Sequence, residues 1–311
     1  MSPSPKVSRR VDNTGVAIAV ILATGFFLAL GDAVIKGIST HFTLWQIFTL
    51  RSLLVLPVLA VALRWRTKAL ALWPKRPGWT LLRSVLLSAM WIAYYTSLLY
   101  VELSIASAVY YSSPIFITLF AAILLGDSVG RAGWFAVVLG AVGVLLILQP
   151  TASALNLYSL LPLASALAYA LAMILTRSQC ADEEPLLLSI WLNLVMLLLG
   201  IGFSLVLSQF SSASLSAGEA FLFGAWGAMN LLQWAAMVVL AVAIIVGSVG
   251  AAVAYQLGRP TTVATFDFAY VAFATAWGAL LFHEVPGPIA SLGVVLIAAA
   301  GLLAVRSRGA E

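Results

Sequence analysis

Long apolar segments recur along the whole chain, separated by short polar stretches. A helix needs about 20 apolar residues to cross a bilayer, because it rises about 1.5 Å per residue across a hydrocarbon core of roughly 30 Å. Segments of about this length occur at 15–38, 44–63, 78–99, 104–126, 132–149, 157–177, 185–208, 232–256, 260–282 and 288–305. The pattern predicts an all-α membrane protein with ten transmembrane helices.

The segment 209–231 departs from this pattern. It begins as a serine-rich polar loop between Ser211 and Ser216 and becomes apolar only between Phe221 and Trp226. That apolar part is too short to cross a bilayer. We therefore expect an interfacial segment that leads into the eighth span, in preference to an additional transmembrane helix.

Basic residues predict the orientation of the spans. With the N-terminus in the cytoplasm, 13 of the 16 Lys and Arg residues lie in cytoplasmic segments and none lies in an outside loop; Lys36, Arg51 and Arg83 lie inside or at the ends of spans. Because Lys and Arg are enriched in cytoplasmic loops, both tails, 1–14 and 306–311, are predicted to be cytoplasmic. No cleavage site follows a short apolar core, so the first span is interpreted as a retained helix in a bacterial inner membrane.

The composition excludes several other classes of protein. Hydrophobic residues make up 63% of the 311 residues and charged residues only 9%, with a mean hydropathy of +1.08. A water-soluble fold of this composition would expose large apolar patches, whereas lipid solvates such a surface. The net charge of +5 does not indicate nucleic-acid binding, because the basic residues lie between apolar spans. One cysteine, Cys180, and two histidines, His41 and His283, provide neither an internal disulfide nor a metal site.

Two parts of the chain resemble each other at a constant offset of 157 residues. Thr118–Leu146 aligns with Thr275–Leu303 without a gap, and both contain an acidic residue followed three positions later by glycine. The repeat divides the chain into two five-span halves, 15–149 and 157–305. Because five is odd, the halves insert with opposite topology. We predict two inverted five-helix repeats, which is an architecture of secondary transporters.

The fourth and ninth spans carry a resemblance to a known family. The fourth contains Ser-Ile-Ala-Ser-Ala at Ser104–Ala108, then Pro114, and ends in Leu-Leu-Gly-Asp at Leu124–Asp127; the ninth ends in Leu-Phe-His-Glu at Leu281–Glu284. In these features nearly the whole chain resembles the drug/metabolite transporter superfamily, in its EamA branch. The second half departs from the pattern, since Val271 stands where Pro114 stands in the first half. The resemblance is strongest to bacterial aromatic and neutral amino-acid exporters.

Charged residues inside spans are the first candidates for a transport site, because an ionisable group in hydrocarbon costs several kcal/mol unless it is paired or hydrated. Asp267 lies about seven residues into the ninth span, among aromatic residues that include Tyr270. We predict that Asp267 binds a substrate ammonium or couples transport to protons. The alternative is a structural carboxylate that caps or pairs with another helix, for example with Arg51 or Arg83.

The other charged residues of the spans also allow two interpretations. Asp32 and Lys36 are spaced i, i+4 on the first span, which suits either a self-neutralising salt bridge or a gate that binds a zwitterion. Arg51 is placed to meet a substrate carboxylate or Asp267. Arg83 is expected to extend its guanidinium to the cytoplasmic interface.

Aromatic side chains form the other group of candidates. In the third and fourth spans these are Trp91, Tyr94, Tyr95, Tyr110 and Tyr111, matched in the second half by Tyr169 and Tyr255. A tyrosine hydroxyl in lipid would be unsatisfied, so these hydroxyls are expected to face a cavity or a partner; helix packing is the alternative for each ring. Tyrosines around a cavity suit a small amphipathic solute. Six tryptophans near span ends are predicted to lie at the membrane interface: Trp45, Trp65, Trp73, Trp79, Trp134 and Trp226.

These features predict a secondary active transporter that exports small metabolites, foremost amino acids, by alternating access. The resemblance implies that spans one to four and six to nine line the path. The alternative is an importer or exchanger of a riboflavin-like vitamin or of a nucleotide-linked sugar. We expect neither catalysis nor direct ATP use, because no histidine lies at depth and the sequence has no Gly-x-x-x-x-Gly-Lys loop. No cofactor is expected. The expected partners are a small-molecule substrate and the lipid bilayer, and the expected state is a monomer or homodimer.

Overall fold

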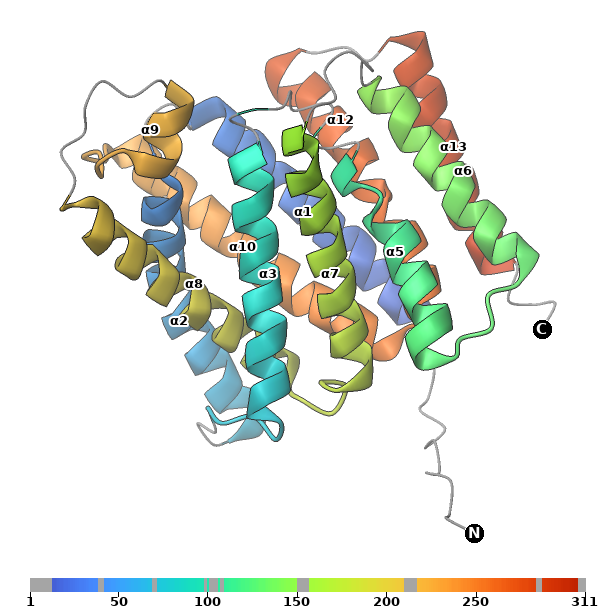
Figure 1. Ribbon diagram of the computed structural model, residues 1–311, viewed down its shortest axis with the longest axis horizontal. Helices are drawn as coiled ribbons and strands as arrows, with labels where there is room; N and C mark the ends of the chain where they lie inside the picture. Colours follow the sequence, from blue (N-terminus) through green and yellow to red (C-terminus); the bar gives the residue numbers. More distant parts are fainter. Residues whose placement is uncertain are drawn as a thin grey trace.

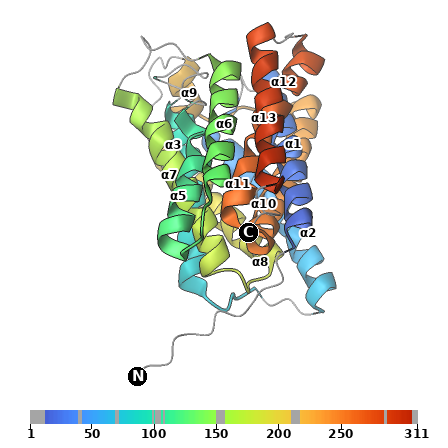
Figure 2. The same cartoon turned by 90° about the vertical axis from the view of Figure 1, so that its right-hand side faces the viewer.

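Every regular element in the described part of a computed structural model is a helix (Figure 1 and Figure 2). The described residues are 13–38, 42–68, 72–97, 100, 106, 109–149, 157–209, 217–283 and 287–306. The helices are α1 Thr14–Ile38, α2 Leu44–Thr67, α3 Pro77–Ser97, α5 Ser113–Phe120, η2 Ala121–Leu125, α6 Arg131–Leu148, η4 Leu157–Ser159, α7 Leu160–Ser178, α8 Pro185–Leu207, α9 Ala217–Phe223, α10 Leu231–Leu257, α11 Pro260–Asp267, α12 Ala269–Phe282 and α13 Pro288–Arg306.

Seven helical stretches among the described residues are long and apolar enough to cross a membrane. They are α1, α2, α6, α7, α8, α10 and the combined stretch of α11 and α12. Two further apolar helices are shorter, Ser113–Leu125 and Pro288–Ala304. The chain is therefore an all-helical, multi-pass membrane protein, and the count of ten spans stays a prediction.

The connection before the eighth predicted span contains a short helix. α9 has seven residues, or roughly 10 Å of helix, which is about a third of the hydrocarbon thickness. A non-helical stretch follows until Asn230, which caps α10: its side chain accepts from the backbone of Gln233 at 2.9 Å, and the Gln233 side chain accepts from the backbone of Asn230 at 2.8 Å. The predicted serine-rich loop at 210–216 lies outside the described residues.

Four pairs of helices make the principal contacts. α6 packs on α13, α1 on α10, α2 on α8 and α3 on α7 (Figure 1). α1 also packs on α12, and α5 on α7. Each principal pair joins one helix from residues 15–149 with one from residues 157–305, so the two halves of the sequence interleave in space.

Glycines allow the closest of these approaches. Gly143 on α6 and Gly293 on α13 each lie against the carbonyl of the other, and a Cβ added at Gly143 would lie 2.8 Å from the Gly293 oxygen. Between α2 and α8, Gly200 lies against the carbonyl of Trp45, whose ring stacks on Phe203 with centroids 4.1 Å apart. Small residues at helix interfaces permit such backbone contact in membranes.

One of the tryptophans predicted at the membrane interface lies elsewhere. Trp45 is only 5% exposed, because α9 covers the start of α2 and the indole Nε1 donates to the carbonyl of Leu222 at 2.8 Å. The prediction for Trp45 was wrong. Exposed positions, as the interface requires, are found for Trp65, Trp73, Trp79 and Trp226.

Polar contacts join the connections at the end of the bundle where α3 and α8 begin. The buried carboxylate of Glu183 accepts from the backbone N–H of Arg76 at 2.7 Å and of Lys75 at 3.0 Å. The side chain of Gln256, near the end of α10, donates to the carbonyl of Glu183 at 2.9 Å. The connection between α2 and α3 is thereby tied to that between α7 and α8.

Candidate functional site

Asp267 lies at a break between two helices. α11 ends at Asp267 and α12 begins at Ala269, with Phe268 between them as the cap residue of both. The interruption is one residue long and the backbone at Phe268 stays helical, with φ −59° and ψ −24°, so α11 and α12 form one span. Phe268 is completely buried and lies against Gly140 of α6, which fixes the position of the break.

Two tyrosine hydroxyls hold the Asp267 carboxylate. Its Oδ2 accepts from the Tyr255 hydroxyl at 2.5 Å and from the Tyr169 hydroxyl at 3.3 Å. Tyr255 lies on α10 and Tyr169 on α7, so three elements converge on one carboxylate oxygen. Neither Arg51 nor Arg83 forms an ion pair with Asp267. Neither arginine is therefore the partner of Asp267, while a structural role that joins α11 to α7 and α10 stays an alternative.

Asp32 is held in a similar way. Its Oδ2 accepts a hydrogen bond from the Tyr270 hydroxyl, which joins α1 to α12. The side chain of Lys36, the predicted salt-bridge partner of Asp32, lies outside the described residues. That pairing stays a prediction.

Ring contacts connect the two carboxylates. Along the direct path the ring centroids are 6.2 Å apart for Tyr169–Tyr110, 5.3 Å for Tyr110–Tyr111 and 5.5 Å for Tyr111–Tyr270. A second path leaves this one at Tyr110, with centroid distances of 5.2 Å for Tyr110–Tyr94, 5.9 Å for Tyr94–Tyr95 and 5.4 Å for Tyr95–Trp91. Together with Tyr255, Asp32 and Asp267, this tyrosine–carboxylate network contains ten of the eleven residues that the sequence analysis proposed. Apart from Tyr255, its members remain partly exposed although they lie between helices of both halves.

The first half has a break that matches the one at Asp267. Val109 and Tyr110 are helical, Tyr111 and Ser112 form a turn, and α5 begins at Ser113. The Ser112 hydroxyl donates to the carbonyl of Val109 at 2.6 Å, which satisfies a backbone group released by the turn. Tyr110 precedes Asp267 by 157 residues, the offset of the sequence repeat. Both breaks thus contribute to the tyrosine–carboxylate network.

Arg51 lies beside the network without an ion pair. Its side chain is 5% exposed, Nη2 lies 3.2 Å from the sulfur of Met196, and the guanidinium lies over the Phe48 ring at 5.6 Å. Its Nε is buried without a hydrogen-bond partner. Asp32 and Tyr95 lie within electrostatic range. Arg51 is therefore a buried cation next to the site with donor capacity to spare.

Arg83 differs from its prediction. It is 1% exposed and packs between α3 and α7, where Nε donates to the Thr176 hydroxyl at 2.6 Å. The expected extension to the cytoplasmic interface is wrong, because α7 covers the face of α3 that carries Arg83. The burial of Arg83 was not predictable from the sequence, because hydropathy does not identify the helix that packs against this face of α3.

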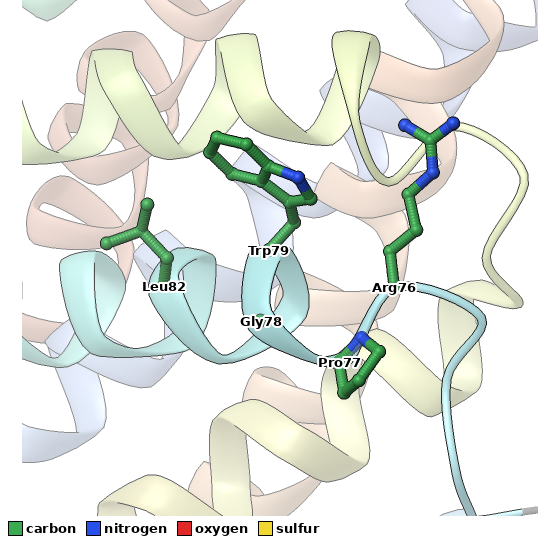
Figure 3. A pocket seen from close by; sticks show the side chains of 5 residues that line it. All are labelled: Arg76, Pro77, Gly78, Trp79 and Leu82. Carbon is green, nitrogen blue, oxygen red and sulfur yellow. The ribbon is translucent and has the colours of Figure 1, made fainter.

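A shallow groove at the start of α3 lies apart from the network. Arg76, Pro77, Gly78, Trp79 and Leu82 line it, and Figure 3 shows their side chains. Trp79 and Leu82 are exposed to the surroundings of the bundle. Nowhere in the described ranges do three His, Cys, Asp or Glu side chains gather as they would around a metal ion. The groove holds none of the predicted site residues.

Sequence reasoning did not find the helix breaks themselves. Pro114 marks the first break, but no proline accompanies the second, where α11 and α12 were predicted as one span. It also did not find Phe221 of α9, whose ring lies 5.8 Å from that of Tyr95. The contact was not predicted because Phe221 follows a polar loop and was assigned to an interfacial segment.

Charged groups held between apolar spanning helices are typical of a multi-pass membrane transporter. Residues 15–149 match the EamA-like transporter family. A riboflavin transporter of Rhizobium johnstonii is 31% identical over 230 residues, which are 74% of this chain and 70% of that protein. The chain belongs to the EamA-like transporter family and is not an enzyme.

Two further comparisons cover nearly the whole chain. The pseudopaline exporter CntI of Pseudomonas aeruginosa is 25% identical over 296 residues, 95% of this chain and 97% of that protein. A crystal structure of a protein with 17% sequence identity superposes with a TM-score of 0.73 and covers 97% of this chain and 99% of its own. The crystal structure establishes the likeness of fold alone.

Proposed function

We propose that the protein is a secondary active transporter that exports small amphipathic metabolites, foremost amino acids, by alternating access. The observation that carries the proposal is Asp267, a carboxylate at a helix break, held by two tyrosine hydroxyls beside a cluster of aromatic rings. A carboxylate in this setting is the natural counter-charge for a substrate ammonium. The partly exposed tyrosine rings supply apolar walls for the remainder of the solute.

The second end of a zwitterion has a partner in the same region. Arg51 lies within electrostatic range of Asp32, is buried and has an Nε without a hydrogen-bond partner. A guanidinium with free donors suits a carboxylate, which it binds through two parallel hydrogen bonds. An amino acid would place its ammonium toward Asp267 or Asp32 and its carboxylate toward Arg51.

The inverted repeat is part of the same proposal: ten spans, with 15–149 and 157–305 as the two five-span halves. The family match ends at residue 149, where the first half is predicted to end. In this repeat the counterpart of α1 is α7 and that of α3 is α10, so the contact of α1 with α10 corresponds to the contact of α7 with α3. The contacts α2–α8 and α6–α13 each join two counterparts. All four contacts occur. The breaks at Tyr111 and Phe268 lie at matching positions. Such a repeat supports alternating access by exchange of two conformations.

The membrane placement completes the proposal. The positions of Lys and Arg support cytoplasmic N- and C-termini in a bacterial inner membrane, with the chain as a monomer or homodimer. An introduced Ser212→Cys should react with an impermeant thiol reagent from outside, whereas Lys68→Cys should not. The opposite result would reverse the orientation.

A second candidate is a flavin, the substrate class named for the Rhizobium johnstonii relative. The rings of Trp91 and Tyr95 stack with an interplanar angle of 19° and offer a flat surface to a planar heterocycle. A flavin carries no ammonium, so its binding would depend on these rings and not on the Asp267 charge.

One experiment separates the two candidates. Purified protein is screened by thermal shift against amino acids, riboflavin and nucleotide sugars, since a ligand that binds the folded state raises apparent stability by mass action. The hits are then tested for flux in vesicles with Asp267→Asn and Trp91→Ala. Amino-acid hits whose flux depends on Asp267 support the proposal, while riboflavin hits that depend on Trp91 alone support the second candidate. A panel without hits contradicts both.

A further inference from the structure

A buried cation between α3 and α7 has no counter-charge in the part of the chain that the structure describes. Arg83 is among the largest fully buried side chains of the described residues, at 1% exposure. Its Nε donates to the Thr176 hydroxyl at 2.6 Å, and its Nη1 is buried without a hydrogen-bond partner among the described residues. A buried charge with unsatisfied donors is costly, and natural structures compensate it with a ligand, an ion or water.

A second buried polar atom faces the same region. The Thr80 hydroxyl, completely buried and three residues before Arg83 on the same face of α3, has the Cys180 thiol as a weak hydrogen-bond partner. The thiol of Cys180, at the turn after α7, lies beside both Thr80 and Arg83. Burial raises the pKa of the Cys180 thiol above its usual range, so the thiol stays neutral and supplies no negative charge.

The other charged groups at this end of the bundle do not neutralise Arg83. The carboxylate of Glu183 is engaged by the backbone N–H groups of Arg76 and Lys75, at 2.7 and 3.0 Å. The guanidinium of Arg177 donates to the carbonyl of Gln256 at 2.5 Å. Arg177 carries the same charge as Arg83, and among the described residues Glu183 forms no ion pair with Arg83, so the Nη1 donor of Arg83 is left for a small anion.

We propose that Arg83 and Thr80 form a binding site for a small monovalent anion of the carboxylate or halide class, between α3 and α7. Nη1 of Arg83 and the Thr80 hydroxyl donate to the anion, and Thr176 holds the guanidinium in place. Tyr169 of the tyrosine–carboxylate network lies within electrostatic range of Arg83, and it precedes Thr176 by two turns of α7, about 10 Å. The site is thus separate from Asp267 but connected to it along one helix.

The anion has two possible sources with the same chemistry. It is either the carboxylate of a solute on its way past α7 or a free halide ion. Acetate and formate stand in for the first source and chloride for the second. A preference for either class supports the site and identifies the source.

The test is the melting temperature of the purified full-length protein in sodium acetate, formate or chloride, compared with sodium gluconate at equal ionic strength because gluconate is too bulky for a buried site. We expect the wild type to melt higher with rising concentration of at least one small anion. Arg83→Gln should weaken the apparent affinity at least tenfold. The exposed Arg131→Gln is the matched control and should respond like the wild type.

A second variant covers the case in which Arg83→Gln does not fold. Thr80→Val removes the hydroxyl and its weak contact with the Cys180 thiol with little change of shape, so the protein should fold and its response to the anion should weaken. If the wild type melts at the same temperature in all four salts, or if the Arg83 and Thr80 variants respond like the wild type, the proposal is overturned and water occupies the site.

Discussion

Asp267→Asn tests whether the carboxylate at the helix break recognises a cationic group. Asparagine keeps the shape of the side chain and removes its charge. Two unit charges about 4 Å apart interact by about 4 kcal/mol at an effective dielectric constant of about 20. Since about 1.4 kcal/mol corresponds to a factor of ten, an amino-acid substrate should bind and be transported roughly 100- to 1,000-fold less well.

The stability of the Asp267→Asn variant should change little. The hydrogen bonds from Tyr255 and Tyr169, at 2.5 and 3.3 Å, lose their charge-assisted character, which costs about 1 kcal/mol each. Removal of a partly buried charge offsets part of this loss. The variant should therefore melt within a few degrees of the wild type.

The assay is substrate flux in reconstituted vesicles, measured together with the melting temperature in detergent. Asp182→Asn is the matched control, because Asp182 is an exposed carboxylate in the connection between α7 and α8, and both readouts should remain as in the wild type. Asp267→Asn with normal flux and normal stability would refute the reasoning, since the carboxylate would then only contact water.

Three further substitutions test the packing of the helices, with Glu184→Gln and Gly202→Ala as controls. Glu183→Gln weakens the acceptor of two backbone N–H groups and should cost about 1–3 kcal/mol in unfolding experiments, whereas Glu184→Gln, in an ion pair that is partly exposed, should cost less than about 1 kcal/mol. Gly140→Ala would place a Cβ in steric conflict with the Phe268 ring, so it should destabilise the protein by about 1–3 kcal/mol and weaken substrate binding. Gly293→Ala meets the Gly143 carbonyl at 2.5 Å and should lower the melting temperature without a specific effect on binding. Gly202→Ala, which meets nothing within 4 Å, should change neither property, and an equal effect at Gly202 would contradict the packing argument.

The sequence predicts the helical fold well because one rule, the length of apolar helix that crosses a bilayer, decides most of it. α2, α7 and α8 occur where the apolar segments lie. The break at Phe268 was not predictable in this way, because it arises where Phe268 packs against Gly140 of a helix far away in the sequence. Hydropathy describes a segment and contains no information about its neighbours.

In the candidate site, too, the sequence predicts which residues take part but not how they contact one another. Asp267 and the tyrosines were selected because polar groups in hydrocarbon need partners, and the structure supplies those partners from within the selected set. Which partner each group takes was not predictable, since an arginine was as good a candidate for Asp267 as a tyrosine. The predicted interfacial positions of Arg83 and Trp45 were wrong for a related reason. A helix covers each side chain, and burial of this kind depends on tertiary contacts.

The central claim is that Asp267 binds the ammonium group of the substrate. It is tested most directly by the affinity of the best-binding amino acid and of its N-acetyl derivative for the wild type and for Asp267→Asn, measured by calorimetry. Acetylation removes the cation from the ligand as the substitution removes the anion from the protein. We predict that acetylation weakens binding to the wild type roughly 100-fold or more and has little effect on the variant, as a direct charge pair requires. An equal loss of affinity in both proteins would contradict the claim, because the ammonium would then be recognised elsewhere.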